Sequence, residues 1–433
     1  MTEKFIIQGQ NKLEGEVLIS GSKNAAASIL PAALLTQESC IINNLPLVED
    51  IFKIIKLLES IGAKVEWLEK RKIKITAGKN LLKENLDLSL LGETRMSVLL
   101  IGPLLSRFKQ FKFMPPGGDK ILGNVRSGEG KRMGLRPITT HLEAFEKLGI
   151  EIKRQDNIYI FNSENLKPTS LILKEFSVTA TENLMMLAAA TPGNTIIKGA
   201  AIEPHIQSLA QMLNKMGAQV KILNNHIIEI NGTKNLKGVE YNIIPDYLEA
   251  GTFMIAGAVT PGVLKIKNFP FNDLDLFLAK LEEMGVKFKV ENDSMEVDFS
   301  PNLKSVRIQA LPYPGFPTDL LPVVIPLLTQ AQGRSLIHDP LYENRLNFLS
   351  ELRKMNADIE IVDPHRAFIF GKTLLFSTDI SSWDIRAGAC LLIAGLIAKG
   401  ETKINNIYQI DRGYEKIDEK LRAVGAKIKR VAS

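Results

Sequence analysis

The feature that most constrains the fold is a phrase that recurs six times along the chain. In each copy a helical run ends in Leu-x-x-x-Gly, with phenylalanine for leucine once and asparagine for glycine once, and a short strand pattern follows. The last residue of the phrase falls at positions 62, 149, 217, 285, 356 and 425. Glycine or asparagine there suits the left-handed residue that ends a helix. The pattern therefore predicts six copies of one structural unit.

A second phrase precedes each of these markers: a helix opened by polar residues, with a body that is apolar all round. The six starts are expected near Lys23, Thr94, Thr181, Glu249, Thr318 and Asp384. Helices without a polar face are buried. Each unit is therefore interpreted as strand, buried helix, strand, amphipathic helix, strand. We expect an α/β protein with buried helices inside and sheets and outer helices around them, and 433 residues favour two domains.

One interval between markers is longer than the others. The spacings are 87, 68, 68, 71 and 69 residues, and the excess falls in the second unit, on residues 115–137. This stretch has six glycines and five cationic side chains, and Asp119 directly follows a Gly-Gly pair. Long loops without their own secondary structure are usually lids, binding loops or linkers. We predict a lid over an anionic substrate; the alternative is a solvated loop between core elements.

Composition restricts the partners. The net charge of +6 favours anionic ligands, but no basic run is dense enough to predict nucleic-acid binding. The five histidines lack metal-ligand spacing, so no metal is expected. The start lacks the apolar stretch of a signal peptide, and the longest apolar run, 389–398, is too short to span a bilayer, so we expect a cytoplasmic protein without membrane contact. Cys40 and Cys390 are expected in the core.

Polar residues at the starts of the buried helices are the first candidates for a binding site. A helix N-terminus attracts anions. If the six starts converge, they collect Lys23, Asn24, Arg95, Asp319 and Arg386, to which we add Arg345 and Arg412 from distinctive phrases. Arginine suits the forked recognition of carboxylate and phosphate. For any single arginine, a solvated surface position is the ordinary alternative.

Several phrases, in this order, resemble the enolpyruvyl transferase family over essentially the full length. They are Ser-Lys23-Asn24-Ala, Pro-Gly-Gly-Asp119, Leu-Arg136-Pro, Pro-Thr-Asp319, Glu-Asn-Arg345, Asp384-Ile-Arg386 and Asp-Arg412-Gly-Tyr-Glu. The Glu-Asn-Arg and Asp-Arg-Gly-Tyr-Glu phrases favour the branch that acts on UDP-N-acetylglucosamine over the shikimate branch. The resemblance implies a two-domain inside-out α/β barrel with three repeats in each domain. The expected domains are 22–245, and 1–21 with 246–433, and the active site is expected in the cleft between them.

The resemblance also implies the reaction. The enolpyruvyl group of phosphoenolpyruvate is transferred to the 3-hydroxyl of UDP-N-acetylglucosamine by addition and elimination, and phosphate is released. This is a transferase step in peptidoglycan precursor synthesis, and through it in cell wall biogenesis, cell shape and cell division. No cofactor is implied. The sequence leaves the oligomeric state open, and a monomer is compatible with it.

Residue roles follow from matching positions. Asp119 corresponds to the general acid of the loop and Asp319 to the group that takes the sugar hydroxyl proton, with Lys23 and Arg412 also in catalytic positions. The residues matched to phosphoenolpyruvate binding are Lys23, Asn24, Arg136, Arg345, Arg386 and Arg412. Those matched to the nucleotide sugar are Asn24, Arg95, Arg136, Pro137, Ile138, Thr139, Thr140, Ser177, Val178, Thr179, Asp319 and Leu341.

Some positions depart from the family pattern. Most members carry cysteine where this chain has Asp119, and the antibiotic fosfomycin acts on that cysteine, so we predict insensitivity. The loop is longer than usual, and its cations Arg126, Lys131 and Arg132 either contact the diphosphate or only solubilise the insertion. On the nucleotide-sugar side, Glu175, Thr179 and Tyr247 replace lysine, glycine and arginine. Two alternatives therefore stay open: another nucleotide or sugar-phosphate acceptor, and a catalytically silent binding paralogue.

Overall fold

The computed structural model describes residues 3–82, 84, 86–116 and 138–432. The chain divides into two compact units, one made of residues 21–244 and the other of residues 1–20 with 245–433. Each has its own hydrophobic core, and the two cores have no residue in common among those described. The chain passes from one unit to the other at 20–21 and again at 244–245. None of the described helices is both long and apolar enough to cross a bilayer.

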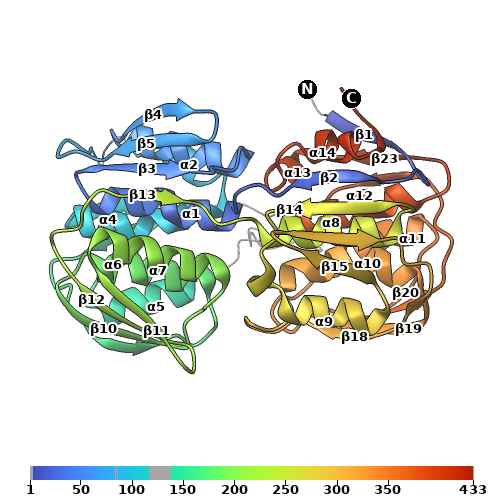
Figure 1. Ribbon diagram of the computed structural model, residues 1–433. Helices are drawn as coiled ribbons and strands as arrows, with labels where there is room; N and C mark the ends of the chain where they lie inside the picture. Colours follow the sequence, from blue (N-terminus) through green and yellow to red (C-terminus); the bar gives the residue numbers. More distant parts are fainter. Residues whose placement is uncertain (1–2, 83, 85, 117–137, 433) are drawn as a thin grey trace. The chain divides into compact units, whose positions relative to one another are not determined.

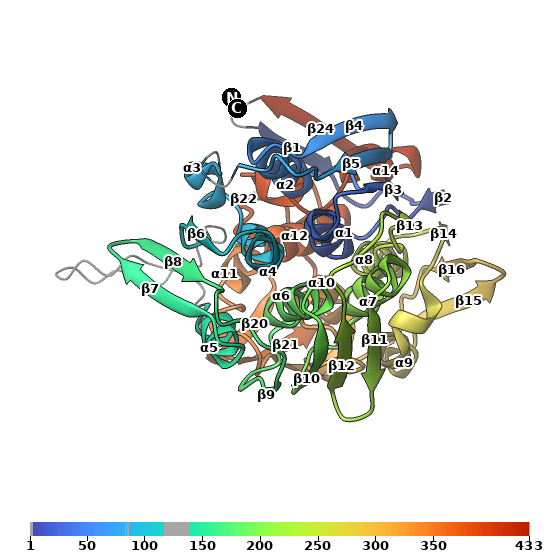
Figure 2. The same ribbon diagram turned by 90° about the vertical axis from the view of Figure 1, so that its left-hand side faces the viewer.

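The unit of residues 21–244 has its buried helices in the middle and its sheets outside (Figure 1). The buried helices are α1 (Lys23–Ala32), α4 (Ile101–Arg107), entered through the 3-10 turn η3 (Arg95–Leu100), and α6 (Val178–Ala189). The outer helices are α2 (Glu49–Ser60), α5 (Thr139–Lys147) and α7 (Pro204–Met216). Figure 2 shows α1, α4 and α6 nearly end-on, with strands of the same unit around them.

Three sheets of this unit are seen in the described residues. The first sheet has the strand order β13 (Glu240–Asn242), β3 (Ser39–Asn43), β5 (Lys72–Thr76), β4 (Lys64–Glu69). The second has the order β11 (Gln219–Leu223), β12 (Ile227–Gly232), β10 (Gly193–Lys198), β9 (Ser170–Ile172). The third has the order β6 (Gln110–Phe113), β8 (Ile158–Asn162), β7 (Glu151–Gln155). The short strands β13 and β9 pair in parallel with the strand that follows a buried helix, and the other pairs are antiparallel. Short turns η1 (Ala33–Leu35) and α3 (Leu88–Leu91) complete the unit.

The other unit repeats this plan. Its buried helices are α8 (Tyr247–Val259), α10 (Leu321–Thr329), entered through η5 (Thr318–Leu320), and α12 (Ile385–Ile397). Its remaining helices are η4 (Phe271–Asp273), α9 (Asp275–Met284), α11 (Leu349–Lys354), α13 (Tyr408–Asp411) and α14 (Ile417–Ala423).

The sheets of the second unit are built partly from the N-terminal residues. The first sheet has the strand order β22 (Asp379–Ser381), β23 (Glu401–Asn405), β1 (Glu3–Gln8), β24 (Lys427–Ala432). The second has the order β15 (Lys287–Glu291), β16 (Ser294–Asp298), β14 (Val263–Lys267), β2 (Gly15–Leu18). The third has the order β17 (Leu303–Lys304), β19 (Ala331–His338), β21 (Arg366–Gly371), β20 (Asp358–Asp363), and β18 (Arg307–Gln309) also pairs with β19. In the first of these sheets, Phe5 faces Ile404 on one side and Arg430 on the other. Residues 1–20 thus supply a central strand of a sheet whose other strands come from the end of the chain.

The sixfold repeat is confirmed at its markers. All six have positive φ, between 73° at Asn356 and 108° at Gly217. The left-handed residue allows the chain to leave an outer helix and enter a strand at once, and only glycine or asparagine adopts it readily. The predicted α/β class with buried helices is confirmed, and both cysteines are buried in the cores.

Two helix starts were predicted too late. Helix α6 begins at Val178 rather than near Thr181, because the Ser177 hydroxyl accepts from the amide of Ala180 and caps the helix. Helix α8 begins at Tyr247 rather than near Glu249, because Asp246 caps it in the same way. The polar residues taken as starts, Thr181 and Glu249, are buried in the first turns.

Candidate active site

Asp319 is held by two arginines within the unit of residues 1–20 and 245–433. Arg345 donates from Nη2 to Oδ1 of Asp319 at 2.5 Å, and Arg386 donates from Nε to Oδ2 at 3.2 Å. The side chains of Arg345 and Arg386 are only 10% and 7% exposed, whereas that of Asp319 is 31% exposed. We call these three residues the Asp319 cluster. Its carboxylate is fixed in orientation and still reachable from outside.

A buried carboxylate, Asp339, organises the segment that carries Arg345. Its Oδ2 accepts from the Thr318 hydroxyl at 2.6 Å, and its Oδ1 accepts from the amides of Leu341 and Tyr342 at 3.0 and 3.2 Å. Arg345 also donates to Thr318 at 3.3 Å, and its Nε lies 3.9 Å from Asp339. The chain after β19 is therefore folded back onto the start of α10, and this brings Arg345 to Asp319.

Arg386 is positioned from two sides. It is the second residue of α12, whose first-turn amides bond to Asp384 at 2.8 and 2.9 Å. Its guanidinium lies over the ring of Tyr414, 5.3 Å from the ring centre, and Tyr414 is hydrogen-bonded through its hydroxyl to Thr252 at 2.8 Å. Cation–π packing in a buried site stabilises such an arrangement. Arg412, buried just after α13, donates to Gln409 at 2.9 Å.

Electrostatics keep both arginines of the Asp319 cluster charged. Burial alone lowers the pKa of Arg345, but the carboxylates of Asp319, Asp339 and Asp384 outweigh it and raise that pKa. Burial also lowers the pKa of Arg386. Tyr414, Asp319 and Asp246 outweigh that effect, so the pKa of Arg386 is raised. Permanent cations with fixed N–H groups can stabilise negative charge as it develops, without rearranging.

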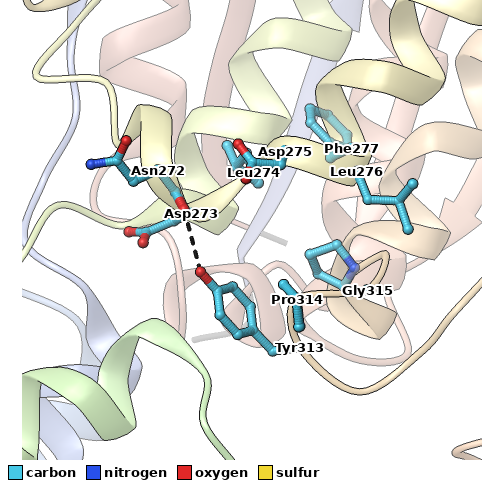
Figure 3. A pocket seen from close by; sticks show the side chains of 10 residues that line it. Asn272, Asp273, Leu274, Asp275, Leu276, Phe277, Tyr313, Pro314 and Gly315 are labelled. Carbon is cyan, nitrogen blue, oxygen red and sulfur yellow. Dashed lines mark hydrogen bonds between the residues drawn. The ribbon is translucent and has the colours of Figure 1, made fainter. Parts of the chain in front are cut away.

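A hollow lies beside the segment that leads to Asp319 (Figure 3). Tyr313 donates from its hydroxyl to the carbonyl of Asn272 at 3.3 Å, so the segment before η5 packs on the η4 turn. Burial, with a contribution from Asp275, raises the pKa of Asp273 there to about 6. None of the predicted site residues that the structure describes lines this hollow.

In the other unit, Lys23 opens α1 and is buried. Its Nζ is 3.1 Å from Oδ2 of Asp50, and the two side chains are 7% and 1% exposed. The start of the helix is capped by Ser22, whose hydroxyl accepts from the amide of Ala25 at 3.3 Å. Asn24 follows at a half-buried position. A buried cation at a helix start is thus fixed by a carboxylate from α2.

The starts of η3, α5 and α6 gather a second set of predicted residues in this unit. Its described members are Arg95, Ile138, Thr139, Thr140, Ser177, Val178 and Thr179, which we call the helix-start group. The hydroxyl of Thr179 lies 2.9 Å from Nε2 of His141, and Thr140 donates to Glu175 at 3.4 Å. Asn183 bonds to the carbonyl of Val98 and the amide of Gly102, at 3.0 and 2.7 Å, and thereby joins α6 to η3 and α4. The unpaired amides of helix starts, with Arg95, suit an anion.

Comparison with known proteins decides the family. A family model described as EPSP synthase (3-phosphoshikimate 1-carboxyvinyltransferase) matches residues 7–421. Proteins named UDP-N-acetylglucosamine 1-carboxyvinyltransferase are 40% identical in Caldanaerobacter subterraneus subsp. tengcongensis, over 99% of this chain and 100% of the relative, and 40% identical in Koribacter versatilis, over 99% and 96%. The chain belongs to the enolpyruvyl transferase family. The predicted family is confirmed.

Solved structures agree with the enolpyruvyl transferase fold. The enolpyruvyl transferase NikO from Streptomyces tendae superimposes with a TM-score of 0.89 at 22% identity, covering 100% of this chain and 99% of that one. An EPSP synthase from Acinetobacter baumannii gives 0.75 at 17% identity, covering 100% of both chains. At such identities the likeness concerns the fold, which is the predicted two-domain inside-out α/β barrel.

The described residues of this enolpyruvyl transferase thus form two groups, one in each unit. Leu341 donates its amide to Asp339, which also contacts Arg345 of the Asp319 cluster, and the Leu341 side chain is 40% exposed. Asp119, Arg136 and Pro137, with Arg126, Lys131 and Arg132, lie outside the described residues. Of the three departures on the nucleotide-sugar side, Glu175 is exposed and bonded to Thr140, whereas Tyr247 is 5% exposed and belongs to a hydrophobic core.

Sequence reasoning missed four residues that support the site: Asp50, Asp339, His141 and Tyr414. Each acts through contacts between elements far apart in sequence, which periodicity does not reveal. Tyr414 had a signal, since it stands two residues after Arg412 in the Asp-Arg-Gly-Tyr-Glu phrase. His141 follows the Arg136-Pro phrase closely, but its neutral, buried state depends on packing that the sequence alone does not specify.

Proposed function

We propose that this enolpyruvyl transferase moves the enolpyruvyl group of phosphoenolpyruvate to the 3-hydroxyl of UDP-N-acetylglucosamine and releases phosphate. Relatives of that name, about 40% identical over the full length, support this acceptor. The observation that carries the chemistry is Asp319, a part-exposed carboxylate fixed between two buried arginines. Such a group is suited to accept a proton from a hydroxyl placed against it.

In the proposed first step, the 3-hydroxyl oxygen attacks C2 of phosphoenolpyruvate while Asp319 takes the hydroxyl proton. Asp119 gives a proton to the methylene carbon, and a tetrahedral intermediate forms. In the second step the bond from C2 to the phosphate oxygen breaks and phosphate leaves, the Asp119 carboxylate takes a proton back from the methyl carbon, and the enol ether remains. Lys23, Arg136 and Arg412 are proposed to bind the carboxylate and phosphate, since cations suit both groups.

Arg345 and Arg386 are proposed to have two tasks. Each uses part of its guanidinium to hold Asp319, as the hydrogen bonds of the Asp319 cluster indicate. The remaining N–H groups are proposed to face phosphoenolpyruvate. Because an arginine has five donors in a rigid plane, one side chain can serve both partners.

The nucleotide sugar is proposed to bind through Asn24, Leu341, Arg136, Pro137 and the helix-start group, with the diphosphate on the helix starts. On this proposal the two units contribute to one reaction. Glu175 is engaged by Thr140 and Tyr247 is buried in a core, so neither departure by itself requires a different acceptor.

The decisive assay is phosphate release from phosphoenolpyruvate with UDP-N-acetylglucosamine, compared with shikimate 3-phosphate and UMP. Release with the nucleotide sugar alone is expected. Release only with another acceptor would support the alternative of a specialised transferase, and no release with any acceptor would support a silent paralogue. A cytoplasmic location is also proposed, and cell fractionation tests it.

Two substitutions test the assigned roles. Asp319→Asn and Lys23→Ala are each expected to reduce kcat by about a hundredfold or more, since both remove a group in contact with reacting atoms. Lys64→Ala is the matched control, because Lys64 is 71% exposed and pairs with a neighbour on its own strand. A near-native rate in either site variant would remove that residue from the mechanism.

A further inference from the structure

His141 is a buried titratable side chain that the proposed reaction does not use. It lies in the first turn of α5, is 2% exposed, and its Nε2 is 2.9 Å from the Thr179 hydroxyl oxygen at the start of α6. Its Nδ1 is buried and has no hydrogen-bond partner among the described residues. The pair therefore joins two helix starts of the helix-start group through one hydrogen bond.

The protonation of His141 is restricted by its surroundings. Burial, together with the nearby positive charge of Arg95, lowers the pKa of His141 to about 3. The imidazole is therefore neutral at ordinary pH and carries one N–H, on Nδ1 or on Nε2. A buried N–H without a partner is rarer and more costly than a buried acceptor without one. The unpartnered Nδ1 thus favours the tautomer with the proton on Nε2.

This tautomer determines what Thr179 can do. With its proton on Nε2, His141 donates to the Thr179 oxygen, and the threonine keeps its own proton for another acceptor. With the opposite tautomer, Thr179 would donate to the ring and its proton would be used. Thr179 is the second residue of a helix of 12 residues, in which Ser177 caps the amide of Ala180. The N-terminal end of the helix dipole, together with Arg95, favours an anion there.

We propose that His141 is a positioning residue that keeps the Thr179 hydroxyl oriented as a donor to an anionic oxygen of the nucleotide sugar. This rests on the proposed function and deepens it by adding a donor at a position where glycine was the expected family residue. The carboxylate nearby in sequence, Glu175, is drawn to Thr140 rather than to Thr179.

The test measures the Kd for UDP-N-acetylglucosamine by calorimetry on the full chain. Thr179→Val removes the hydroxyl at nearly constant shape, and His141→Phe removes the donor that orients it. Each is expected to weaken binding about tenfold, which is the loss of one hydrogen bond to a charged group. The double variant is expected to be no weaker than either single one, because the two side chains act as a unit. Thr179→Ser is expected to restore the binding.

The control is another buried hydrogen-bonded pair of the same unit. Tyr241 and Ser208 have hydroxyls 2.9 Å apart, so Tyr241→Phe removes a comparable contact and is expected to leave the Kd unchanged. Thermal unfolding of every variant separates lost binding from lost folding; if His141→Phe does not fold, His141→Gln, which keeps a donor, must bind like the native chain.

The result also separates this inference from the proposed function. Suppose that the native chain turns over the nucleotide sugar. If the losses of affinity in the two single variants then add up in the double variant, or if Thr179→Val leaves the Kd unchanged, the role of His141 is overturned and the proposed reaction stands. Absence of binding to the native chain counts against both. A nitrogen-15 spectrum of labelled histidine gives an independent readout: the His141 signals must show protonated Nε2 and bare Nδ1 from about pH 5 to 9.

Discussion

At the scale of single residues, the Asp319 cluster depends on the shape of arginine as much as on its charge. Arg345 reaches Asp319, Thr318 and Asp339 with three different nitrogens. Lysine has the charge but offers a single nitrogen, so it cannot keep all three contacts. Arg345→Lys should therefore lower kcat at least tenfold and destabilise the fold by about 1–3 kcal/mol, because the buried Asp339 loses a partner. Steady-state kinetics and thermal unfolding measure both effects.

The comparison for that variant is Arg366→Lys. Arg366 is 51% exposed and pairs with Asp363 three residues before it. The same exchange there should leave kcat unchanged and alter the free energy of unfolding by no more than about 0.5 kcal/mol. Equal effects in the two variants would mean that the geometry of Arg345 is unimportant.

Asp119 carries a prediction of its own, although it lies outside the described residues. A carboxylate is a far poorer nucleophile than a thiolate toward the epoxide of fosfomycin. The native chain should therefore keep its mass and activity after incubation with the drug, whereas Asp119→Cys should gain one covalent adduct, both read by mass spectrometry. An adduct on native Asp119 would contradict the prediction.

Glu182 makes stability depend on pH. Burial raises the pKa of its carboxyl to about 8, with a further contribution from Glu203, while the Ser28 hydroxyl opposes. In the unfolded chain this carboxyl loses its proton near its ordinary pKa of 4.5, so the unfolded chain binds fewer protons than the folded one between pH 4.5 and 8. Stability must then fall as pH rises from about 4.5 to about 8.

Glu182→Gln removes that dependence. Its advantage over the native chain in denaturant unfolding should grow across this window, reaching on the order of 2–4 kcal/mol. Glu164→Gln, at an exposed position, is the control and should show no such trend. A constant difference between Glu182→Gln and the native chain from pH 5 to 8 would refute the buried, protonated state of Glu182.

At the scale of elements, the sequence predicts the ends of the outer helices better than the starts of the inner ones. An end is determined locally, by one residue able to adopt positive φ, as at Gly62 or Asn356. A start can be capped by several neighbouring polar residues, and tertiary packing selected Ser177 over the expected Thr181. The meeting of Asp319 and Arg386, 67 residues apart, was expected from the repeat, because both stand at starts of buried helices. The approach of Arg345 depends on the buried Asp339 and on the fold of the segment after β19, which no periodic pattern encodes.

One contact between elements should influence the site from outside it. Arg430 in β24 makes a two-pronged bond to Asp411 at 2.7 and 2.8 Å, and Asp411 ends α13 directly before Arg412. Arg430 also donates to the carboxylate of Glu3 in β1 at 2.9 Å. The last strand thereby fixes the turn that carries a proposed phosphoenolpyruvate ligand.

Arg430→Ala should accordingly raise the KM for phosphoenolpyruvate several-fold and leave the KM for the nucleotide sugar nearly unchanged. It should also destabilise the fold by about 1–2 kcal/mol, because Asp411, Glu3 and Asp418 each lose a charged partner. Lys416→Ala is the neighbouring control, since Lys416 is 62% exposed and pairs only with Glu419 among the ion pairs of the described residues. Equal changes in both KM values would indicate general loosening instead.

At the scale of the whole molecule, the two units differ in how their chain is arranged. Residues 21–244 are contiguous and enclose a complete hydrophobic core, whereas the other unit is assembled from both ends of the chain. There β1 lies between β23 and β24, and Phe5 and Ile7 are fully buried in the core. Removing residues 1–20 would split that sheet and leave the inner edges of β23 and β24 without backbone partners.

Separate expression should expose this asymmetry. The fragment 21–244 is expected to fold alone, with one cooperative unfolding transition in circular dichroism and no phosphate release, since it lacks Asp319. The fragment 245–433 is expected to stay unfolded or aggregate, because burying two large apolar side chains contributes roughly 3–6 kcal/mol, comparable to the stability of a whole domain. Joining residues 1–20 to its C-terminus through a flexible linker should restore folding, because β1 already pairs antiparallel with β24. If the fragment 245–433 is as stable without β1 as with it, the N-terminal strand is not required for this unit to fold, and the sixth repeat is structurally complete without that strand.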